Sequence, residues 1–198
     1  MTLYYIRSLP FCKHLLLWRV FGLNFPSRYG IIDVLLSLGG SDMAVDVSIV
    51  PCKSYDAEEC RTALTQALAP FGGLDWVKEG MRVVVKVNLV SAMKPEQAAT
   101  THPMLLCELT KMLRERGASV LLGDSPGGLY TAAHLNHVYD VSGMHDCEAA
   151  GAELNQDFSQ SDASFPEAVC AKKFTYTAYL DRADAIIDFC KLKTHGMM

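Results

Sequence analysis

The feature that most restricts the fold is the apolar stretch 81–89, which reads Met-Arg-Val-Val-Val-Lys-Val-Asn-Leu. Its valines fall on both faces of an extended chain, so a strand formed here must be covered on both sides. Further strand-like runs follow, and they alternate with stretches that repeat apolar residues at helical spacing. The expected strands are 45–50, 81–89, 118–122 and 183–190, and the expected helices are 56–68, the stretch from Thr100 or Thr101 to Gly117, 131–139 and 143–150.

Alternating strands and helices indicate an α/β fold with a mostly parallel sheet and right-handed connections. We expect helices on both faces of this sheet. The run 174–180 alternates apolar and polar residues like a half-exposed strand, so some antiparallel pairing is expected within 152–180. The last expected strand, 183–190, stands close to the end of the sequence, so we expect the sheet to be incomplete at its C-terminal side.

Residues 1–42 differ from the rest, because they contain basic residues but no acid before Asp33. We expect them to lie outside the domain, which leaves 43–198 as a single, truncated α/β domain. Two interpretations stay open: translated upstream sequence ahead of a true start at Met43, or an amphipathic transit peptide. Charged residues interrupt the apolar stretch 11–25, and a membrane span needs about 20 apolar residues, so no span is expected.

Charge and cysteine spacing exclude several classes of protein. The formal net charge of −4 disfavours nucleic-acid binding, which usually relies on a basic surface. Seven cysteines are present but none forms a C-x-x-C pair, so we expect neither a zinc ribbon nor an iron–sulfur cluster within this chain. Scattered cysteines in odd number indicate reduced thiols in a cytoplasmic protein. His134 and His137 share a helix face without further ligands, so no metal site is expected.

Four polar motifs stand where an expected strand ends or an expected helix begins. In an open parallel sheet, ligands bind beyond the carboxyl ends of the strands, so these positions favour a binding site. The motifs are Lys86-Val87-Asn88, Thr100-Thr101-His102-Pro103, Gly123-Asp124-Ser125-Pro126-Gly127-Gly128 and Lys191-Leu192-Lys193-Thr194-His195.

The lysines and histidines of these motifs favour a small anionic ligand such as phosphate, a nucleotide or a carboxylate. Lysine acts there as a point charge, and we expect Lys86, Lys191 and Lys193 to hold the anion. His102 and His195 are the candidate proton carriers, because their charge changes near neutral pH. Further candidate ligand contacts are Asn88, Thr101 and Thr194. The ordinary alternatives are a lysine that reaches solvent, a threonine that caps a helix and a solvated charged face.

The glycine-rich loop after the strand 118–122 is the third candidate contact. Glycines let backbone N–H groups approach a ligand closely, so Ser125, Gly127 and Gly128 are expected to cradle the anion. Asp124 is a candidate for orienting a substrate or a metal. The spacing matches neither a phosphate-binding P-loop nor a dinucleotide-binding fingerprint, so a tight turn between strand and helix is the alternative.

With these four motifs in this order, the chain from about Val45 to Met198 resembles an uncharacterised prokaryotic family, domain of unknown function three-six-two. Members of that family generally continue past the Lys-Thr-His motif, and many also have a ferredoxin-like iron–sulfur module. The resemblance therefore implies an amino-terminal fragment. It also implies that a cluster would be held only by a missing C-terminal region or by a partner. Members usually have proline where this chain has Val87.

The leading hypothesis is an anionic-ligand-binding α/β domain that is part of an iron–sulfur-linked or metabolic enzyme. Two alternatives stay open. One is a non-catalytic module that docks a redox or iron–sulfur partner, and the other is a non-functional gene fragment. Apolar surface left by an incomplete sheet also favours a homo-oligomer.

Overall fold

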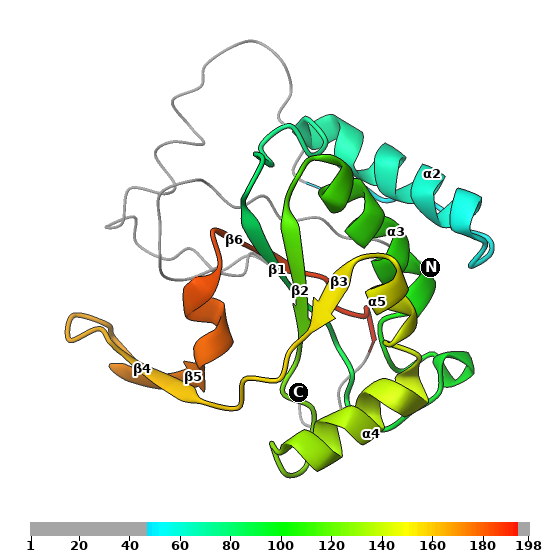
Figure 1. Ribbon diagram of the computed structural model, residues 1–198. Helices are drawn as coiled ribbons and strands as arrows, with labels where there is room; N and C mark the ends of the chain where they lie inside the picture. Colours follow the sequence, from blue (N-terminus) through cyan, green and yellow to red (C-terminus); the bar gives the residue numbers. More distant parts are fainter. Residues whose placement is uncertain (1–46, 194–198) are drawn as a thin grey trace, which may run out of the picture.

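A four-stranded parallel sheet forms the centre of the fold in the computed structural model, which describes residues 47–193 (Figure 1). The strand order is β3-β2-β1-β6. The strands are β1 (Arg82–Lys86), β2 (Ser119–Gly123), β3 (Ala152–Leu154) and β6 (Ala185–Asp188). Every neighbouring pair in this sheet is parallel, so the expected α/β fold with a mostly parallel sheet is confirmed.

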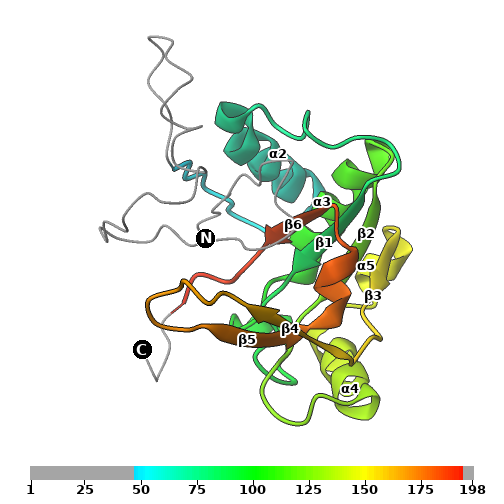
Figure 2. The same ribbon diagram turned by 90° about the vertical axis from the view of Figure 1, so that its left-hand side faces the viewer.

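Helices flank the sheet on both sides (Figures 1 and 2). One face is covered by α2 (Ala57–Leu68) and α3 (Pro103–Glu115), with the short α5 (Asp146–Ala149) beside α3. The opposite face carries a 3-10 helix, η3 (Ala178–Arg182), instead of an α-helix. The helix α4 (Ala132–Ser142) lies beyond the carboxyl ends of β2 and β3. Two further 3-10 turns are η1 (Ala69–Phe71) and η2 (Pro95–Gln97).

The core lies between the sheet and the layer of α2 and α3. Val83 and Val85 of β1 point into it together with Leu122 of β2, and Leu106 and Leu113 meet them from α3. Each such side chain stabilises the fold by about 1.5–3 kcal/mol when it leaves water. Val84, on the other face of β1, is also fully buried. A strand that is apolar on both faces is therefore covered on both faces, as its sequence predicts.

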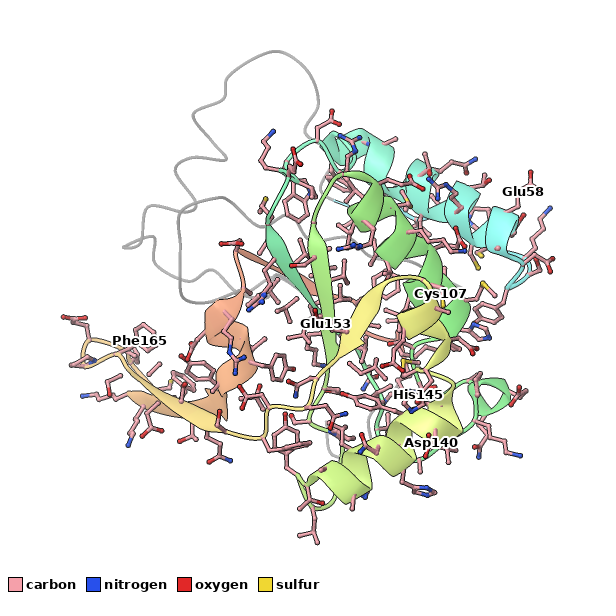
Figure 3. All side chains as sticks on the ribbon, viewed as in Figure 1. Glu58, Cys107, Asp140, His145, Glu153 and Phe165 are labelled. Atoms are coloured by element: carbon pink, nitrogen blue, oxygen red, sulfur yellow. The ribbon has the colours of Figure 1, made fainter. Side chains whose placement is uncertain are left out.

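A separate antiparallel pair extends from the main sheet (Figure 2). It consists of β4 (Gln160–Ser164) and β5 (Lys173–Thr177), which confirms the antiparallel pairing expected within 152–180. Hydrogen bonds anchor it to η3, because the Ser161 hydroxyl and the Tyr176 hydroxyl both donate to the Asp181 carboxylate, at 2.5 Å and 2.7 Å. Figure 3 labels Phe165 at the far end of this hairpin.

Several local predictions were wrong. The expected strand 174–180 ends at Thr177, where η3 follows, and β3 was not among the expected strands. The described part of the expected strand 45–50, residues 47–50, forms no strand. Val50 packs into the core while Val47 and Ile49 stay exposed. The alternation of apolar residues therefore corresponds to one core contact and not to a strand within a sheet. The cap of α3 is His102, not a threonine, because the Thr101 hydroxyl is used elsewhere. The interpretations of residues 1–46 and 194–198 fall outside the described residues.

Within residues 47–193, no helix combines the length and the apolar character that crossing a bilayer requires.

Candidate functional site

The carboxyl ends of β1, β2 and β6 meet at one edge of the sheet, and the register fixes the neighbours there. Lys86 ends β1, opposite Gly123 of β2 on one side and Asp188 of β6 on the other. Just beyond the strands, the N–H of Val87 donates to the Gly123 carbonyl at 3.0 Å, and the N–H of Phe189 donates to the Lys86 carbonyl at 2.8 Å. Lys86 therefore stands between two other strand ends, with 38% of its side chain exposed.

Asp124 anchors the loops that follow β1 and β2. Its Oδ2 accepts the backbone N–H of Leu89 at 2.7 Å, and its Oδ1 accepts the N–H of Ser125 at 2.9 Å. Oδ1 also lies 3.7 Å from Nζ of Lys86. Charge-assisted bonds of this kind are among the stronger ones in proteins, so the buried carboxylate fixes both loops and compensates the lysine charge. Both oxygens of Asp124 are thus engaged within the protein.

Asp188 is a second carboxyl at this edge, and sequence reasoning missed it. Its Oδ1 is buried without a hydrogen-bond partner. Burial raises the pKa of this carboxyl; the nearby Lys86 charge opposes the rise and Asp124 adds to it. The stretch 183–190 was interpreted only as a buried strand. The sequence could nevertheless have indicated Asp188, because a carboxylate within an apolar strand is costly to bury alone, as is the lysine charge of Lys86.

Thr101 ties the start of α3 to the ends of β1 and β6. Its hydroxyl donates to the Phe189 carbonyl at 3.0 Å and accepts the N–H of Asn88 at 3.0 Å. The N–H of Thr101 also donates to the Asn88 carbonyl at 2.9 Å. These bonds join two of the predicted motifs, 86–88 and 100–103, to the end of β6, which precedes a third. They also show that the Thr101 hydroxyl, a predicted ligand contact, is occupied by protein groups. The neighbouring Thr100 hydroxyl is buried with no hydrogen-bond partner.

His102 begins α3 and lies beside the Lys191 segment. Its Nδ1 accepts the N–H of Met104 at 3.2 Å, which assigns the ring hydrogen of the neutral side chain to Nε2. The ring stacks on Tyr55, with centroids 3.4 Å apart, a contact that sequence reasoning did not foresee. Burial lowers the pKa of His102, the Lys191 charge lowers it further, and Glu96 opposes both. These surroundings therefore favour the neutral form of His102.

The glycine-rich loop is less open than predicted. The N–H of Gly127 donates to the Val90 carbonyl at 2.8 Å, and the N–H of Ser125 is held by Asp124. Gly128 has a φ of 108°, and a Cβ there would lie 2.9 Å from Nε2 of His134. The Gly127 carbonyl is bonded to the same His134 nitrogen at 2.9 Å. The loop thus uses two of the backbone donors that were expected to cradle an anion.

The two lysines after β6 differ in their surroundings. Lys191 is half-buried and close enough to His102 to act on its charge, whereas Lys193 is exposed. Thr194 and His195 lie outside the described residues. Within residues 47–193, no group of three or more His, Cys, Asp or Glu side chains is placed to hold a metal ion. The edge therefore carries two separate groups, Lys86 with the carboxyl groups of Asp124 and Asp188, and His102 with Lys191.

Comparisons with known proteins give a matching family model and a similar curated protein. Residues 83–198 match the model of a family described as Domain of unknown function (DUF362). The chain is also similar to the Thylakoid-associated protein sll1697 of Synechocystis sp. (strain ATCC 27184 / PCC 6803 / Kazusa), with 28% identity over 159 residues. That alignment covers 79% of this chain and 47% of the relative, so the chain spans about half the length of the curated relative that it matches. No solved structure matches the chain.

Proposed function

The chain belongs to the family described as Domain of unknown function (DUF362), and from that premise we propose that it binds a small anionic ligand at the carboxyl edge of its sheet. The ligand would be a phosphate, a nucleotide or a carboxylate. Two observations support the proposal: Lys86 ends β1 beside Asp188 of β6, and Lys191, which follows β6, lies close enough to His102 at the start of α3 to lower its pKa. Cationic side chains at this edge of a parallel sheet are well placed to attract an anion.

Lys86 is the centre of the proposed site. Its ammonium is compensated from behind by Asp124, which the backbone holds in place, and part of its side chain remains open to solvent. In this proposal Asp124 is a positioning residue, because both of its oxygens are already bonded. The anion approaches Lys86 from the exposed side, with Lys191 as a second point charge and the exposed Lys193 as a third.

Asp188 restricts which kinds of ligand fit the proposed site. Its buried Oδ1 is an acceptor without a donor, and buried polar atoms are normally satisfied. A ligand that carries a hydroxyl or an amine next to its anionic group would supply that donor. We therefore favour a ligand with both an anionic group and a hydrogen-bond donor over a simple inorganic anion.

His102 enters the proposal as a neutral donor. Nδ1 already accepts a hydrogen bond from Met104, so the Nε2–H group is the one available to the ligand. The lowered pKa favours the uncharged imidazole. A role in proton transfer would require the Met104 bond to break, so hydrogen bonding through Nε2 is the role that this geometry supports.

For the larger protein we propose an iron–sulfur-linked or metabolic enzyme in the cytoplasm, with any cluster held outside this chain. The family resemblance supports this proposal. The name of the relative, Thylakoid-associated protein, suggests membrane association as the alternative location. Cell fractionation of the natural host, followed by immunoblotting, distinguishes the two locations.

Thermal shift assays test ligand binding directly. Phosphate, nucleotides, simple carboxylates, and carboxylates with a hydroxyl or amino group are each added to the full chain. We expect the last group to raise the Tm most. A ligand at 100 times its Kd stabilises the folded state by about 2.7 kcal/mol.

A matched pair of double variants separates a specific site from general charge attraction. Lys191→Ala with Lys193→Ala removes two lysines at the edge, and Lys78→Ala with Lys172→Ala removes two exposed lysines elsewhere. We expect only the first pair to abolish the shift. Equal loss in both, or no shift with any anion on the unmodified chain, would contradict the proposed function.

A further inference from the structure

Two buried cysteines from different helices face each other on the layer that covers the sheet. Cys107 of α3 and Cys147 of α5 are 40 residues apart in sequence, yet their Sγ atoms are 3.5 Å apart. Cys107 is 6% exposed and Cys147 is fully buried. Figure 3 labels Cys107 on α3. Both cysteines are free thiols.

We propose that Cys107 and Cys147 form a reversible, peroxide-driven disulfide that links α3 to α5. A disulfide has a sulfur–sulfur distance of about 2.05 Å, so closing the pair requires the two atoms to approach by about 1.5 Å. Disulfides that form in reducing compartments are usually transient and redox-sensing, which fits a pair that rests in the thiol state.

The exposure of the two thiols assigns their roles. Cys107 keeps a small accessible surface, and hydrogen bonding with Cys147 lowers the pKa of its thiol, so Cys107 is the one that meets the oxidant. The same bond and burial raise the pKa of Cys147. Hydrogen peroxide is small enough to reach a nearly buried sulfur, whereas a larger disulfide oxidant is not.

The chemistry balances in two steps. The Cys107 thiolate attacks one peroxide oxygen, the O–O bond breaks, and Cys107 becomes a sulfenic acid while hydroxide leaves and takes up the thiol proton as water. The Cys147 sulfur then attacks the Cys107 sulfur. The new S–S bond forms as the S–O bond breaks, and the departing oxygen leaves with the Cys147 proton as a second water. Peroxide is reduced by two electrons and the two thiols are oxidised.

Oxidation of the two cysteines would also change a hydrogen bond at the start of α3. In the thiol state Cys147 donates to the carbonyl of Pro103, at a sulfur–oxygen distance of 3.7 Å. Pro103 is the first residue of α3 and follows His102 directly. The disulfide has no S–H group, so oxidation removes this bond next to the candidate site. The inference itself does not depend on the proposed ligand, because it rests on the thiol pair alone.

Peptide mapping of the native, full-length chain tests the inference. The protein is treated with hydrogen peroxide, alkylated without reductant and digested with two proteases. Trypsin cuts between Cys107 and Cys147, at Lys111, Arg114 and Arg116, and Glu-C cuts between Cys147 and Cys170, at Glu148, Glu153 and Glu167. We expect a linked pair of peptides that contain Cys107 and Cys147, and its loss after dithiothreitol. We also expect the oxidised chain to have a higher Tm than the reduced chain.

Variants supply the controls. In Cys147→Ser the resolving thiol is gone, so dimedone added with denaturant after the peroxide treatment should trap a sulfenic acid on Cys107. A double variant of the exposed thiols, Cys170→Ser with Cys190→Ser, should leave the linked peptide unchanged. The inference is overturned if peroxide oxidises the exposed cysteines while Cys107 and Cys147 are recovered as free thiols, or if Cys107 links to another cysteine. Mapping of the unmodified chain decides the matter even if the serine variant fails to fold.

Discussion

Among single residues, Val90 is the one whose backbone is most clearly strained. It has a φ of 60°, a left-handed conformation that β-branched residues rarely adopt. Its carbonyl accepts the N–H of Gly127, which holds the loop after β1 against the loop after β2. The strain is thus stored between two of the loops that form the candidate site, where such outliers tend to occur.

Replacing Val90 with glycine should stabilise the chain by about 1 kcal/mol. Glycine adopts this conformation without steric cost, and the relief exceeds the entropy it adds to the unfolded state. Urea unfolding measures the change. Val169→Gly is the control, because Val169 is 95% exposed and has no positive φ, so it should not gain stability. A destabilised Val90→Gly chain would mean that the contacts of the valine side chain outweigh the strain.

His145 gives the chain a stability that depends on pH. Its Nδ1 is 2.6 Å from Glu148, and its Nε2 is 3.0 Å from Asp140; Figure 3 labels His145 and Asp140. The hydrogen bond with Glu148, with help from the Asp140 charge, raises the pKa of His145 above its ordinary value of 6.5. A raised folded pKa means that the stabilisation is complete below pH 6.5 and disappears as the pH rises through the folded pKa.

His145→Gln should therefore cost stability only at acidic and neutral pH. The loss should be small, on the order of 0.5 kcal/mol, because the group is exposed and solvent screens it. Chemical unfolding of both proteins across this pH range measures the difference. His137→Gln, at an exposed histidine of α4, is the matched control. A difference that grows at alkaline pH would contradict the sign.

At the scale of elements, η3 depends on a glycine in the strand below it. A Cβ on Gly123 would lie 2.7 Å from the Tyr179 ring, so Gly123→Ala should push η3 away from β2. We expect a loss of about 1–3 kcal/mol from overpacking. In a Tyr179→Ala background the same change should cost much less, since the clash has been removed. Denaturant unfolding of the four proteins of this cycle measures the coupling, and additive losses would show that the contact is not the cause.

The elements with strong periodicity could be predicted from sequence, and those that depend on distant partners could not. The apolar stripe of α3 and the valines of β1 identify a helix and a strand by themselves, because the spacing of the apolar residues is enough to predict each element. Residues 47–50 have a strand pattern but no neighbouring strand, and sequence alone does not reveal a missing partner. The cap of α3 was assigned to a threonine because the local pattern fits. The Thr101 hydroxyl instead bonds to Phe189, which is 88 residues away.

For the whole molecule, the sequence predicts that its polar motifs converge but not how their charges pair. Strand order places Lys86, Asp124 and Lys191 at the same end of the sheet, which follows from any parallel α/β arrangement. The neighbours of Lys86 follow only from the order β2-β1-β6, which brings Asp188 beside it. In the glycine-rich loop, the N–H groups of Ser125 and Gly127 donate to Asp124 and to the Val90 carbonyl. These bonds depend on distances that a periodic sequence pattern does not encode.

Self-association remains a prediction at this scale. Within residues 47–193, β6 pairs on one side only, and an unpaired edge strand can recruit a second chain. Light scattering at increasing concentration should show dimers, and Ile186→Lys, which places a charge on β6, should reduce them. Leu129→Lys, at a residue 76% exposed and far from this edge in sequence, is the control. A clean monomer at all concentrations would exclude this mode of association.

The pairing of β1 with β6 has a consequence for how the protein is made. Arg82 and Asp184 meet across 102 residues, because the N–H of the first donates to the carboxylate of the second. Translation proceeds at about 5–20 residues per second, so β1 emerges from the ribosome roughly 5–20 seconds before its neighbour. During that interval an apolar strand has one side uncovered. Chains truncated before residue 184 and released from the ribosome should therefore stay bound to chaperones, whereas the chain through Met198 should be released.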